Sequence, residues 1–475
     1  MSFHSWQYGV LLVVTLIAYW CLARHRTARL WVMVAASMFY YGSFAPWFLW
    51  LLLITIAVDY CVARAMERTE DHRRRKLLVT VSLVSNLGLL AYFKYTGWLS
   101  GLADPALAES GSNLRLAQYA WHSLVPAGIS FYTFDTLSYT IDVYRKKIPA
   151  VRSPLELGVF VSFFPHLIAG PIIRAADFLP QLDLRPWLRR AEFHEGLWRF
   201  GLGLAKKTLL ADQIGQLLVD PVYTQPQNYH PLLHAAAIYG FAFQIYCDFS
   251  GYSDMAIGSA KLFGLTFKEN FDSPYRSRSC SEFWRRWHIS LSSWVRDYLF
   301  ISLGGSRGSE WKVARNLMIT MIILGLWHGA SNLWLVYGTL QGAALVLERW
   351  LTRRQEAATG KKVEKRGLLG WFITFHFIVV TTVFIRATSF AQVEGLFTHA
   401  GPSMQVWTEE WMNVVAWAAL IVAAITHFWP ERWFAALRER VMALPTPVMG
   451  AGLGLLVGTL FVVMQGQTGF IYFQF

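Results

Sequence analysis

The chain has 475 residues, of which 55% are hydrophobic and only 15% are charged. Ordinary soluble domains carry about 25% charged residues, so this composition argues against a soluble protein and predicts a polytopic membrane protein. The formal net charge of +13 does not indicate a nucleic-acid partner, because the basic residues gather in short clusters between apolar runs, as in "RHRTAR" at 24–29 and "RRRK" at 73–76. This placement is the positive-inside pattern of membrane proteins.

Apolar runs of helical length recur from one end of the chain to the other. They cover residues 8–23, 30–44, 46–63, 77–93, 119–140, 155–172, 196–219, 231–247, 313–330, 332–348, 367–386, 411–428 and 447–465. Because about 20 residues cross the hydrocarbon core and several runs are shorter, we expect about 10–12 transmembrane helices together with re-entrant and interfacial helices. The predicted fold is therefore an all-α, polytopic integral membrane protein, with residues 1–475 forming a single transmembrane domain.

The first run, 8–23, has no lysine or arginine before it and no small-residue cleavage site after it. We therefore interpret it as a retained span with the N-terminus outside the cytoplasm, and not as a signal peptide. On this topology the basic segments 24–29 and 64–76 lie in the cytoplasm, and 94–118 is a long outer loop. The charged segment 352–366 is expected to be a solvated cytoplasmic loop.

The segment "FFPHLIAGPIIR" at 163–174 interrupts an apolar run with Pro165, Gly170 and Pro171. Proline removes a backbone donor and clashes with the preceding helical turn. Broken backbone at membrane depth is tolerated only where it is buried in protein or lines water. The sequence therefore predicts a re-entrant element carrying His166 and Arg174; the alternative is a kinked helix with a hydrogen-bonded histidine.

The segment "QIYCDFSGYSDMAIG" at 244–258 carries two pairs of polar residues at helical spacing, Asp248 with Tyr252 and Ser250 with Asp254. Residues four apart share one face of a helix. Ionisable groups at membrane depth normally face a cavity or each other. The pattern indicates a hydrated cavity or a hydrogen-bond network, and the network alone would serve helix packing.

The segment "SEFWRRWHISLSSWVRDYLF" at 281–300 reads as one amphipathic helix. An aromatic stripe recurs at three- and four-residue steps, and a second face is polar. The stripe contains Trp284, Trp287, Leu291, Trp294 and Tyr298, and the polar face contains Arg285, His288, Ser292 and Arg296. Such a helix suits the membrane interface, with tryptophans at headgroup depth. The alternative to a functional His288 is an interfacial anchor whose histidine faces water.

The run 313–347 contains 35 residues, with Arg315 and His328 as its only basic residues and no acidic residue. At ~1.5 Å per residue it is too long for one untilted span. The stretch "GLWHGASN" at 325–332 places glycines on both sides of Trp327 and His328 and marks a break near the middle. We therefore expect His328 to lie at a bend at membrane depth, where a histidine is a candidate for chemistry.

Motifs for several other chemistries are missing from the sequence. There is no HExxH, because "EFHEG" at 192–196 does not fit, and no cluster of metal-ligating residues surrounds His328 in the sequence. GxSxG, a Walker loop and a Gly-rich dinucleotide motif are also missing. We expect no metal site, and a histidine general base remains, since imidazole titrates near neutral pH.

At these residues the chain resembles the membrane-bound O-acyltransferase family, and within it the bacterial branch that O-acetylates exported polysaccharides. The motifs occur in the branch's order and cover essentially the whole chain. They are "FPHLIAGPIIR", "YCDFSGYSDMAIG", "NFDSPYRSRSCSEFWRRWH", "LGLWHGAS" and the closing "FIYFQF". By this resemblance the histidine of the WHG motif, His328, is the catalytic base, and the histidine of the RRWH motif, His288, is a second polar position of the site.

The resemblance also implies a fold and a reaction. The fold is a ring of tilted helices around a central tunnel that brings a cytoplasmic donor to a site reachable from the other side. The implied activity is an O-acetyltransferase that moves acetyl groups from acetyl-CoA across the bacterial inner membrane, with a periplasmic N-terminus. An acetyl thioester is already activated, so no cofactor is needed. The implied partners are a periplasmic SGNH-type acetyltransferase and an exported polysaccharide such as alginate.

Three alternatives to that function stay open. Within the family, the acceptor could be peptidoglycan, or the reaction could be transfer of D-alanine to teichoic acid. Outside it, a membrane transporter would also contain broken helices and buried charges. Genes for a carrier protein and a ligase beside this one would favour D-alanine transfer.

Several residues are expected to bind the donor or the substrate. Arginine and lysine suit the phosphates of coenzyme A, although positive-inside topology alone would also explain basic residues near the cytoplasm. The candidates are Arg285, Arg286 and Lys268 for the donor, with Asp248, Tyr252 and Trp327 at the substrate. In the tail, "GQTGFIYFQF", Tyr472 could reach His328 and accept the acyl group transiently, by analogy with the teichoic-acid D-alanylation system. The alternative is an aromatic membrane anchor.

Overall fold

The computed structural model describes residues 3, 5–44, 46–110, 114–121, 125–168, 170–184, 186, 189–361, 367–398 and 413–463, with side chains up to residue 458. The described residues form helices and contain no β-strand, which confirms the predicted all-α class. The chain divides into two compact units, Met1–Gly196 with Ala256–Lys268 and Leu197–Met255 with Glu269–Phe475. Helices α8 (Arg190–Ala205) and α11 (Pro231–Leu262) each run from one unit into the other.

The first unit is built mainly from its N-terminal helices. These are α1 (Trp6–Cys21), α2 (Arg26–Gly42), η1 (Pro46–Phe48), α3 (Leu49–Glu67), α4 (His72–Glu109), η2 (Leu116–Tyr119), α5 (Ile129–Tyr144), α6 (Pro154–Ser162) and α7 (Ala175–Asp183). Helices α1, α2 and α3 begin and end within four residues of the predicted runs 8–23, 30–44 and 46–63. Helix α5 begins ten residues after the start of the predicted run 119–140, and α6 ends ten residues before the end of 155–172. Helix α4 continues to Glu109, so the prediction of a loop from residue 94 is wrong over 94–109. Its apolar side chains continue past the expected end of the span.

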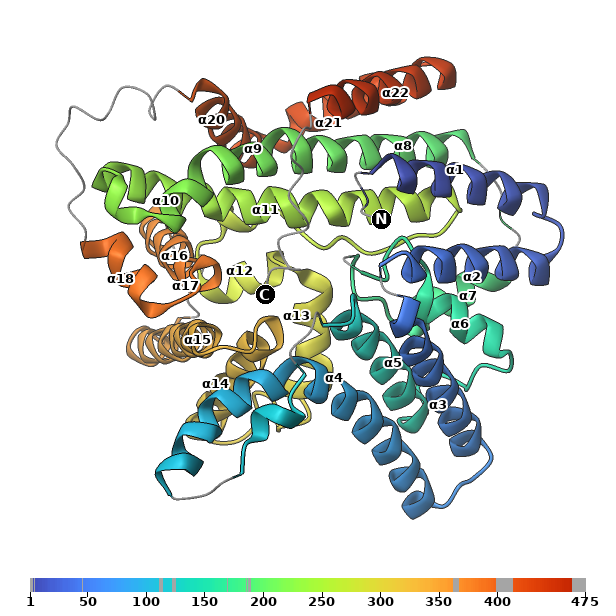
Figure 1. Ribbon diagram of the computed structural model, residues 1–475, viewed down its shortest axis with the longest axis horizontal. Coiled ribbons are helices and arrows are strands. Elements are labelled where there is room, and N and C mark those ends of the chain that lie inside the picture. Colours follow the sequence, from blue (N-terminus) through green and yellow to red (C-terminus); the bar gives the residue numbers. More distant parts are fainter. Residues whose placement is uncertain are drawn as a thin grey trace. The chain divides into compact units, whose positions relative to one another are not determined.

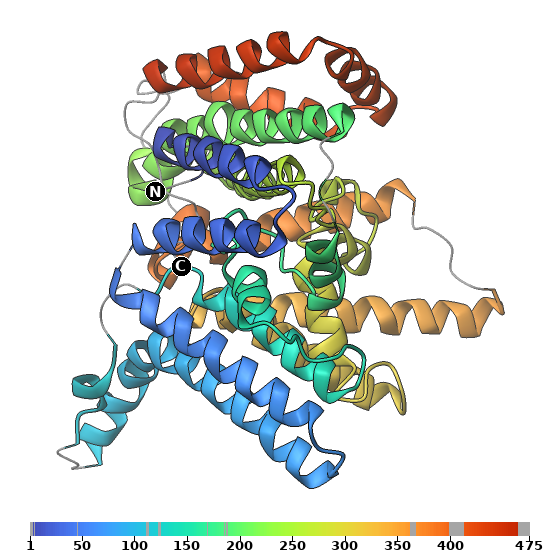
Figure 2. The ribbon, with the colours of Figure 1, turned by 90° about the vertical axis from the view of Figure 1, so that its right-hand side faces the viewer.

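Helices α3, α4 and α5 pack side by side in the first unit (Figures 1 and 2). They enclose a buried carboxyl group, since Asp59 accepts hydrogen bonds from Ser82 Oγ at 2.6 Å and from Asn86 Nδ2 at 3.0 Å. Thr136 Oγ1 in turn donates to Asn86 Oδ1 at 3.1 Å. Buried polar groups are stable only when they are paired, so this network fixes how the three helices meet.

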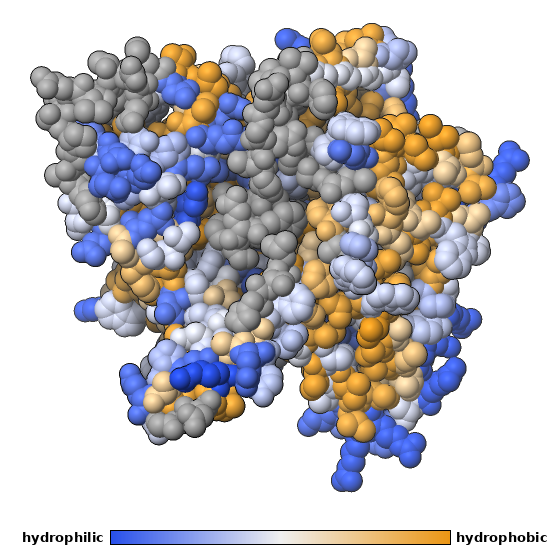
Figure 3. Space-filling model, in the orientation of Figure 1, coloured by the Kyte–Doolittle hydropathy of each residue, from blue (hydrophilic) through white to orange (hydrophobic). Residues whose placement is uncertain are grey.

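The outer face of α3 and α4 is apolar, and the turn that joins these helices is charged (Figure 3). Exposed apolar side chains of these two helices include Ile54, Val81 and Val84. The tip carries ion pairs such as Lys146 with Glu70. An apolar shaft with a charged end is typical of helices that cross a bilayer and emerge into water.

The segment after α6 leaves the helical conformation, as predicted from its prolines and glycine. A Cβ at Gly170 would lie 2.4 Å from His166 Cα, so only glycine fits there. The His166 ring is buried, its Nε2–H donates to Phe160 O at 3.1 Å, and its Nδ1 lies 3.6 Å from Asp135 Oδ2. The break is thus confirmed, and its histidine is hydrogen-bonded within the protein.

The second unit holds the rest of the helices. They are η3 (Lys206–Ala211), α9 (Asp212–Ile214), η4 (Gly215–Val219), α10 (Asp220–Thr224), η5 (Pro226–Asn228), η6 (Pro274–Arg276), α12 (Cys280–Arg286), α13 (Ile289–Val295), η7 (Arg296–Phe300), α14 (Glu310–His328), α15 (Asn332–Thr359), α16 (Leu368–Thr381), α17 (Val383–Arg386), α18 (Phe390–Thr398), α20 (Val414–Phe428), α21 (Glu431–Met442) and α22 (Thr446–Val463). Elements η3, η4 and η7 are π-helical turns. The predicted loop at 352–366 is helical up to Thr359.

Helices α14 and α15 form a tight antiparallel pair (Figure 1). Their backbones touch where glycines face each other, because a Cβ at Gly325 would lie 2.9 Å from Gly338 Cα, and one at Gly338 would lie 2.6 Å from Met321 O. Small residues allow such close approach between membrane helices. The turn between them confirms the predicted break in the long apolar run.

By length and composition, three helical stretches of the described chain could cross a membrane alone, Pro46–Glu67, His72–Glu109 and Leu368–Arg386. A fourth is the pair α20 and α21, which is bent by 100°, if it counts as one span. Other apolar helices are shorter; α1 has 16 residues and α2 has 17. Three expectations stay predictions: about 10–12 membrane crossings, a single domain, and a ring of helices around a tunnel.

Candidate active site

His288 lies at a backbone kink between two short helices. Helix α12 ends at Arg286, Trp287 is extended, and His288 adopts the left-handed conformation with φ of 43° before α13 begins. The kink is held by main-chain hydrogen bonds to the segment before α12, from Asp272 N to Arg286 O at 3.0 Å and from Ile289 N to Asn270 O at 2.9 Å. The prediction of one continuous helix over 281–300 is therefore wrong, because this long-range pairing overrides the helical periodicity.

The His288 ring is completely buried, so the alternative in which it faces water is also wrong. Phe249 packs edge-on against it with ring centroids 4.6 Å apart, and Phe271 lies 6.5 Å away. A non-glycine residue in the left-handed region costs about 1–3 kcal/mol. Such strain clusters at functional sites, where the surrounding structure compensates for it.

The Asn270 side chain forms hydrogen bonds with His288 and with residues beside it. Its Oδ1 accepts the Ser290 N–H at 3.2 Å and the Ser290 hydroxyl at 2.9 Å, and it lies 3.1 Å from His288 Nδ1. Its Nδ2 donates to Ser253 Oγ at 3.0 Å. The amide orientation follows from the Ser290 N–H, which can only donate, so the atom facing it must be the oxygen.

The orientation of Asn270 decides the tautomer of His288. An amide oxygen can only accept, so the neighbouring Nδ1 carries the proton and donates it. Nε2 then carries the lone pair, and it is buried with no hydrogen-bond partner among the described residues. Since buried polar groups are nearly always paired, an unpaired ring nitrogen with a lone pair marks a place for a substrate proton.

His328 is the last residue of α14 and is 6% exposed. Its ring stacks on Trp334 of α15 with centroids 5.4 Å apart, and Trp327 lies edge-on at 4.8 Å. A Cβ at Gly329 would lie 2.0 Å from Trp334 Cδ1, so glycine is needed for this stack. His328 thus lies at the end of a helix and between two tryptophans.

Asp248 and Tyr252 lie on one face of α11, as their spacing predicts, and both meet Lys207. Lys207 Nζ lies 2.5 Å from Asp248 Oδ1 and 2.7 Å from Asp212 Oδ1, and it sits 5.7 Å from the centroid of the Tyr252 ring. All three charged side chains are at most 5% exposed. Asp248 is therefore engaged in a buried ion-pair network, and the hydrogen-bond-network interpretation of this segment is the one the structure supports.

A second cluster surrounds Asp254. Lys206 Nζ and Arg199 Nη2 each lie 2.7 Å from its carboxylate, and Arg199 also binds Glu269. The sequence interpretation missed Lys206 and Lys207, although two adjacent lysines inside the apolar run 196–219 are a signal of buried charge. Buried charges of this kind need partners, which α11 supplies to both lysines and α9 supplies to Lys207 as well.

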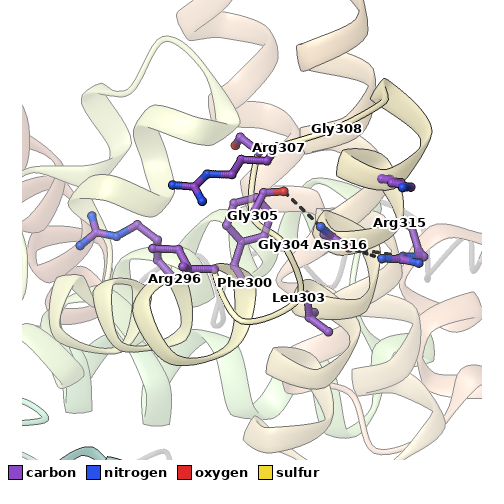
Figure 4. A pocket seen from close by; sticks show the side chains of 12 residues that line it. Arg296, Phe300, Leu303, Gly304, Gly305, Arg307, Gly308, Arg315 and Asn316 are labelled. Carbon is purple, nitrogen blue, oxygen red and sulfur yellow. Dashed lines mark hydrogen bonds between the residues drawn. The ribbon is translucent and has the colours of Figure 1, made fainter. Parts of the chain in front are cut away.

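A basic hollow lies at the loop between η7 and α14 (Figure 4). It has a volume of about 820 Å³ and is lined by four basic side chains and no carboxylate within the described chain. The four are Arg296, Arg307, Lys312 and Arg315. A neighbouring hollow of about 850 Å³ shares Phe300 and Ser306 with it and is lined by Arg285 together with Arg349, Arg353, Lys361 and two glutamates.

The three predicted donor-binding residues have different surroundings. Arg285 lines the second hollow, whereas Arg286 is paired with Asp272 and Glu282 at 3.1 Å each. Lys268 lies in the other unit and binds Asp177 at 2.6 Å. The structure thus leaves Arg285 facing an open space and engages the other two in ion pairs. Tyr472 lies outside the described residues.

The described part of the chain is helical and has apolar helices long enough to cross a membrane, and His288 and His328 are buried at breaks between its helices. Ionisable groups buried in this way are candidates for chemistry at membrane depth. The pattern of the membrane-bound O-acyltransferase family matches residues 116–389. The chain is also 36% identical over 445 residues to a probable alginate O-acetylase of Pseudomonas aeruginosa, covering 92% of this chain and 82% of the relative. The chain therefore belongs to the membrane-bound O-acyltransferase family and is a membrane O-acyltransferase.

Other relatives of the chain are named for transfer to different acceptors or of a different acyl group. A peptidoglycan O-acetyltransferase of Helicobacter pylori is 33% identical over 388 residues, covering 76% of this chain and 71% of the relative. A teichoic acid D-alanyltransferase of Bacillus subtilis is 26% identical over 275 residues, covering 54% and 68%. The matched region of the family contains both His288 and His328.

Proposed function

We propose that this protein transfers acetyl groups from cytoplasmic acetyl-CoA across the bacterial inner membrane for O-acetylation of an exported polysaccharide such as alginate. The observation that carries the proposal is the 36% identity to a probable alginate O-acetylase over 92% of the chain. The buried, broken setting of both histidines supports chemistry at membrane depth. In this proposal the N-terminus is periplasmic and the basic turn between α3 and α4 is cytoplasmic.

The reaction needs a base for a hydroxyl group. His328 takes the proton of the attacking hydroxyl as the new C–O bond forms at the thioester carbonyl. The tetrahedral intermediate then breaks the C–S bond, and the coenzyme A thiolate recovers the proton from the imidazolium. The tryptophans around His328 exclude water and so protect the acyl group from hydrolysis. His288 lies at the second polar position of this site and serves the transfer by accepting a hydrogen bond at Nε2.

The acetyl group also has to leave the membrane. We propose that Tyr472 accepts it from the thioester, with His328 removing the phenolic proton, and that a periplasmic SGNH-type acetyltransferase then moves it to the polymer. Phenol has an unperturbed pKa of about 10 and needs such a base to act as a nucleophile. Trp327 packs against His328. Asp248 and Tyr252 contact Lys207 on α11, the helix whose Phe249 packs against His288, and in this proposal they fix that helix.

A second acceptor is supported by the relative from Helicobacter pylori, whose name specifies peptidoglycan. The chemistry at the membrane would be the same for both polymers, and only the partner and the final hydroxyl would differ. D-alanine transfer is less favoured because the D-alanyltransferase of Bacillus subtilis shares a shorter match and lower identity.

The proposal is tested in cells that make the polymer. Deleting the gene should remove O-acetyl groups from the exported polysaccharide, as measured by NMR of the purified polymer, and the wild-type gene should restore them. A polymer with unchanged acetylation after deletion would refute the polysaccharide role. If peptidoglycan muropeptides lose acetyl groups instead, the acceptor is the cell wall.

A further inference from the structure

The loop between η7 and α14 has an unusual backbone and an unusual charge. Gly304, Gly305 and Gly308 adopt positive φ values of 111°, 59° and 96°, which side chains rarely permit. The main-chain N–H groups of Gly304 and Gly305 are already bonded, to Ile301 O at 3.0 Å and to Phe300 O at 2.8 Å, so what this loop offers a ligand is the charge of the side chains around it. The lining of the hollow at this loop is basic, as described above.

A hydrogen bond from α14 holds the glycine loop in place. Asn316 Nδ2 donates to Gly305 O at 3.1 Å, and Arg315 donates to Asn316 Oδ1 at 3.0 Å, as the dashed lines in Figure 4 show. In this view Arg296 and Arg307 extend toward the same side of the glycine loop, and Arg315 lies at the other end (Figure 4). The loop is therefore a fixed element on one side of an open basic hollow.

Two of the cations that line the hollow have no carboxylate partner in the described part of the chain. Arg296 is paired with Asp297 at 2.8 Å, but the side chains of Arg307 and Lys312 have no ion pair or hydrogen bond with any described residue. By contrast, Arg349 of the second hollow and Arg286 of α12 are both paired with carboxylates. Cationic side chains that line an open hollow and lack carboxylate partners in the described chain suit the phosphate groups of a ligand.

We propose that this hollow binds the phosphates of a nucleotide thioester, with Arg307 and Lys312 contacting the diphosphate and Arg296 or Arg315 the remaining phosphate. The inference rests on the proposed function, because acetyl-CoA is the donor there, and it deepens that function by assigning the donor's binding residues. It replaces Arg286 and Lys268, whose charges are engaged elsewhere.

The distance to His328 suits this donor. Asn316, at the hollow, and His328 both belong to α14 and are 12 residues apart, which is ~18 Å along a helix. A pantetheine arm has about 13 bonds from phosphorus to sulfur and spans ~16 Å when extended, at ~1.2 Å per bond. A thioester anchored in the hollow by its phosphates thus has the reach to approach the end of α14. The hollow should lie on the cytoplasmic face, where acetyl-CoA is made.

The test compares three acetyl donors that differ in phosphate content: acetyl-CoA, acetyl-dephospho-CoA and S-acetyl-pantetheine. For the wild-type protein in detergent without anionic lipid, we expect KM to rise in that order. The double variant Arg307→Gln, Lys312→Gln should raise KM for acetyl-CoA by on the order of 100-fold, leave kcat nearly unchanged, and remove most of the difference between the donors. The matched control is Arg432→Gln, Arg440→Gln on α21, which has no buried residue.

Equal KM values for acetyl-CoA in the wild type and the loop variant would overturn the site while leaving the transferase function intact. Equilibrium binding of CoA alone, measured by calorimetry, provides a readout that does not depend on turnover. If CoA binds and depends on Arg307 and Lys312 but no acetyl transfer occurs, the proposed function fails and the site stands. If vesicles containing phosphatidylglycerol occupy the hollow and CoA does not, the site is a lipid-headgroup site and the inference is wrong.

Discussion

The hydrogen bonds of Asn270 make a sharp prediction for His288. The variant Asn270→Ala removes the acceptor of the Ser290 N–H and of His288 Nδ1–H, and it leaves the buried Nδ1–H only the longer contact to Ser290 Oγ at 3.4 Å. An unsatisfied buried donor costs about 1–3 kcal/mol. The ring can then relax to the other tautomer or leave its left-handed conformation. A loss of ~2.7 kcal/mol in the transition state lowers kcat about 100-fold, and we expect this loss in kcat with little change in KM.

Two further variants separate positioning from simple stability. Asn270→Asp keeps an acceptor for Nδ1–H, so activity should partly return. Its carboxylate also favours the charged imidazolium, so a higher pH is needed to keep the ring neutral, and the acid limb of the pH–rate profile should move to higher pH. Ser253→Ala removes only the partner of Asn270 Nδ2 and should leave the profile in place.

The assay is acetyl transfer by protein reconstituted in liposomes, with folding checked by thermal unfolding in detergent. If Asn270→Ala keeps the wild-type kcat, Asn270 does not position His288. If the aspartate variant loses activity without any change in its pH profile, the role of Asn270 is structural only.

Four more substitutions have defined outcomes. His328→Ala should abolish acetylation of the polymer while expression and membrane insertion stay normal, as measured by NMR of the polymer and by immunoblot of membranes; wild-type acetylation would exclude it as the base. Gly329→Ala should displace Trp334 from His328 and lower kcat at least 10-fold, whereas Gly367→Ala, with open space around its Cβ position, should not; equal rates would contradict the need for this stack. Lys207→Met should destabilise the protein by about 3–5 kcal/mol by leaving buried carboxylates unpaired, seen as a lower unfolding temperature, and an unchanged temperature would show that the carboxylates are neutral. Tyr472→Phe should prevent acetylation, with loss of an acetylated C-terminal peptide in mass spectrometry, and full acetylation would show that the tail carries no acyl group.

The helical framework could be predicted from the sequence because apolar runs of helical length carry their own signal. The breaks at 163–174 and near His328 were also predictable, since proline and glycine disrupt helices locally. The pairing of Asp248 and Tyr252 on one face of α11 followed from four-residue spacing. Each of these features depends on residues close together in the chain.

The features that the sequence did not reveal depend on residues far apart. The kink at His288 arises because residues 270–272 pair with the backbone after α12, and no local pattern encodes that pairing. The partners of Lys207 come from α9 and α11, so its spacing alone could not identify them. Likewise, Arg286 and Lys268 are as basic as Arg307, and only their carboxylate neighbours in three dimensions distinguish them.

The most direct test of the central claim is acetyl transfer by the purified protein reconstituted in sealed liposomes. Acetyl-CoA labelled in the acetyl group is supplied on the side of the basic turn between α3 and α4, and cleavage of the thioester and the fate of the label are followed. We predict that the wild type cleaves the thioester and moves label to a hydroxyl acceptor or to Tyr472, and that His328→Ala does neither. Thioester cleavage at the same rate in both proteins, or none in the wild type, would contradict an acyltransfer centre built on His328.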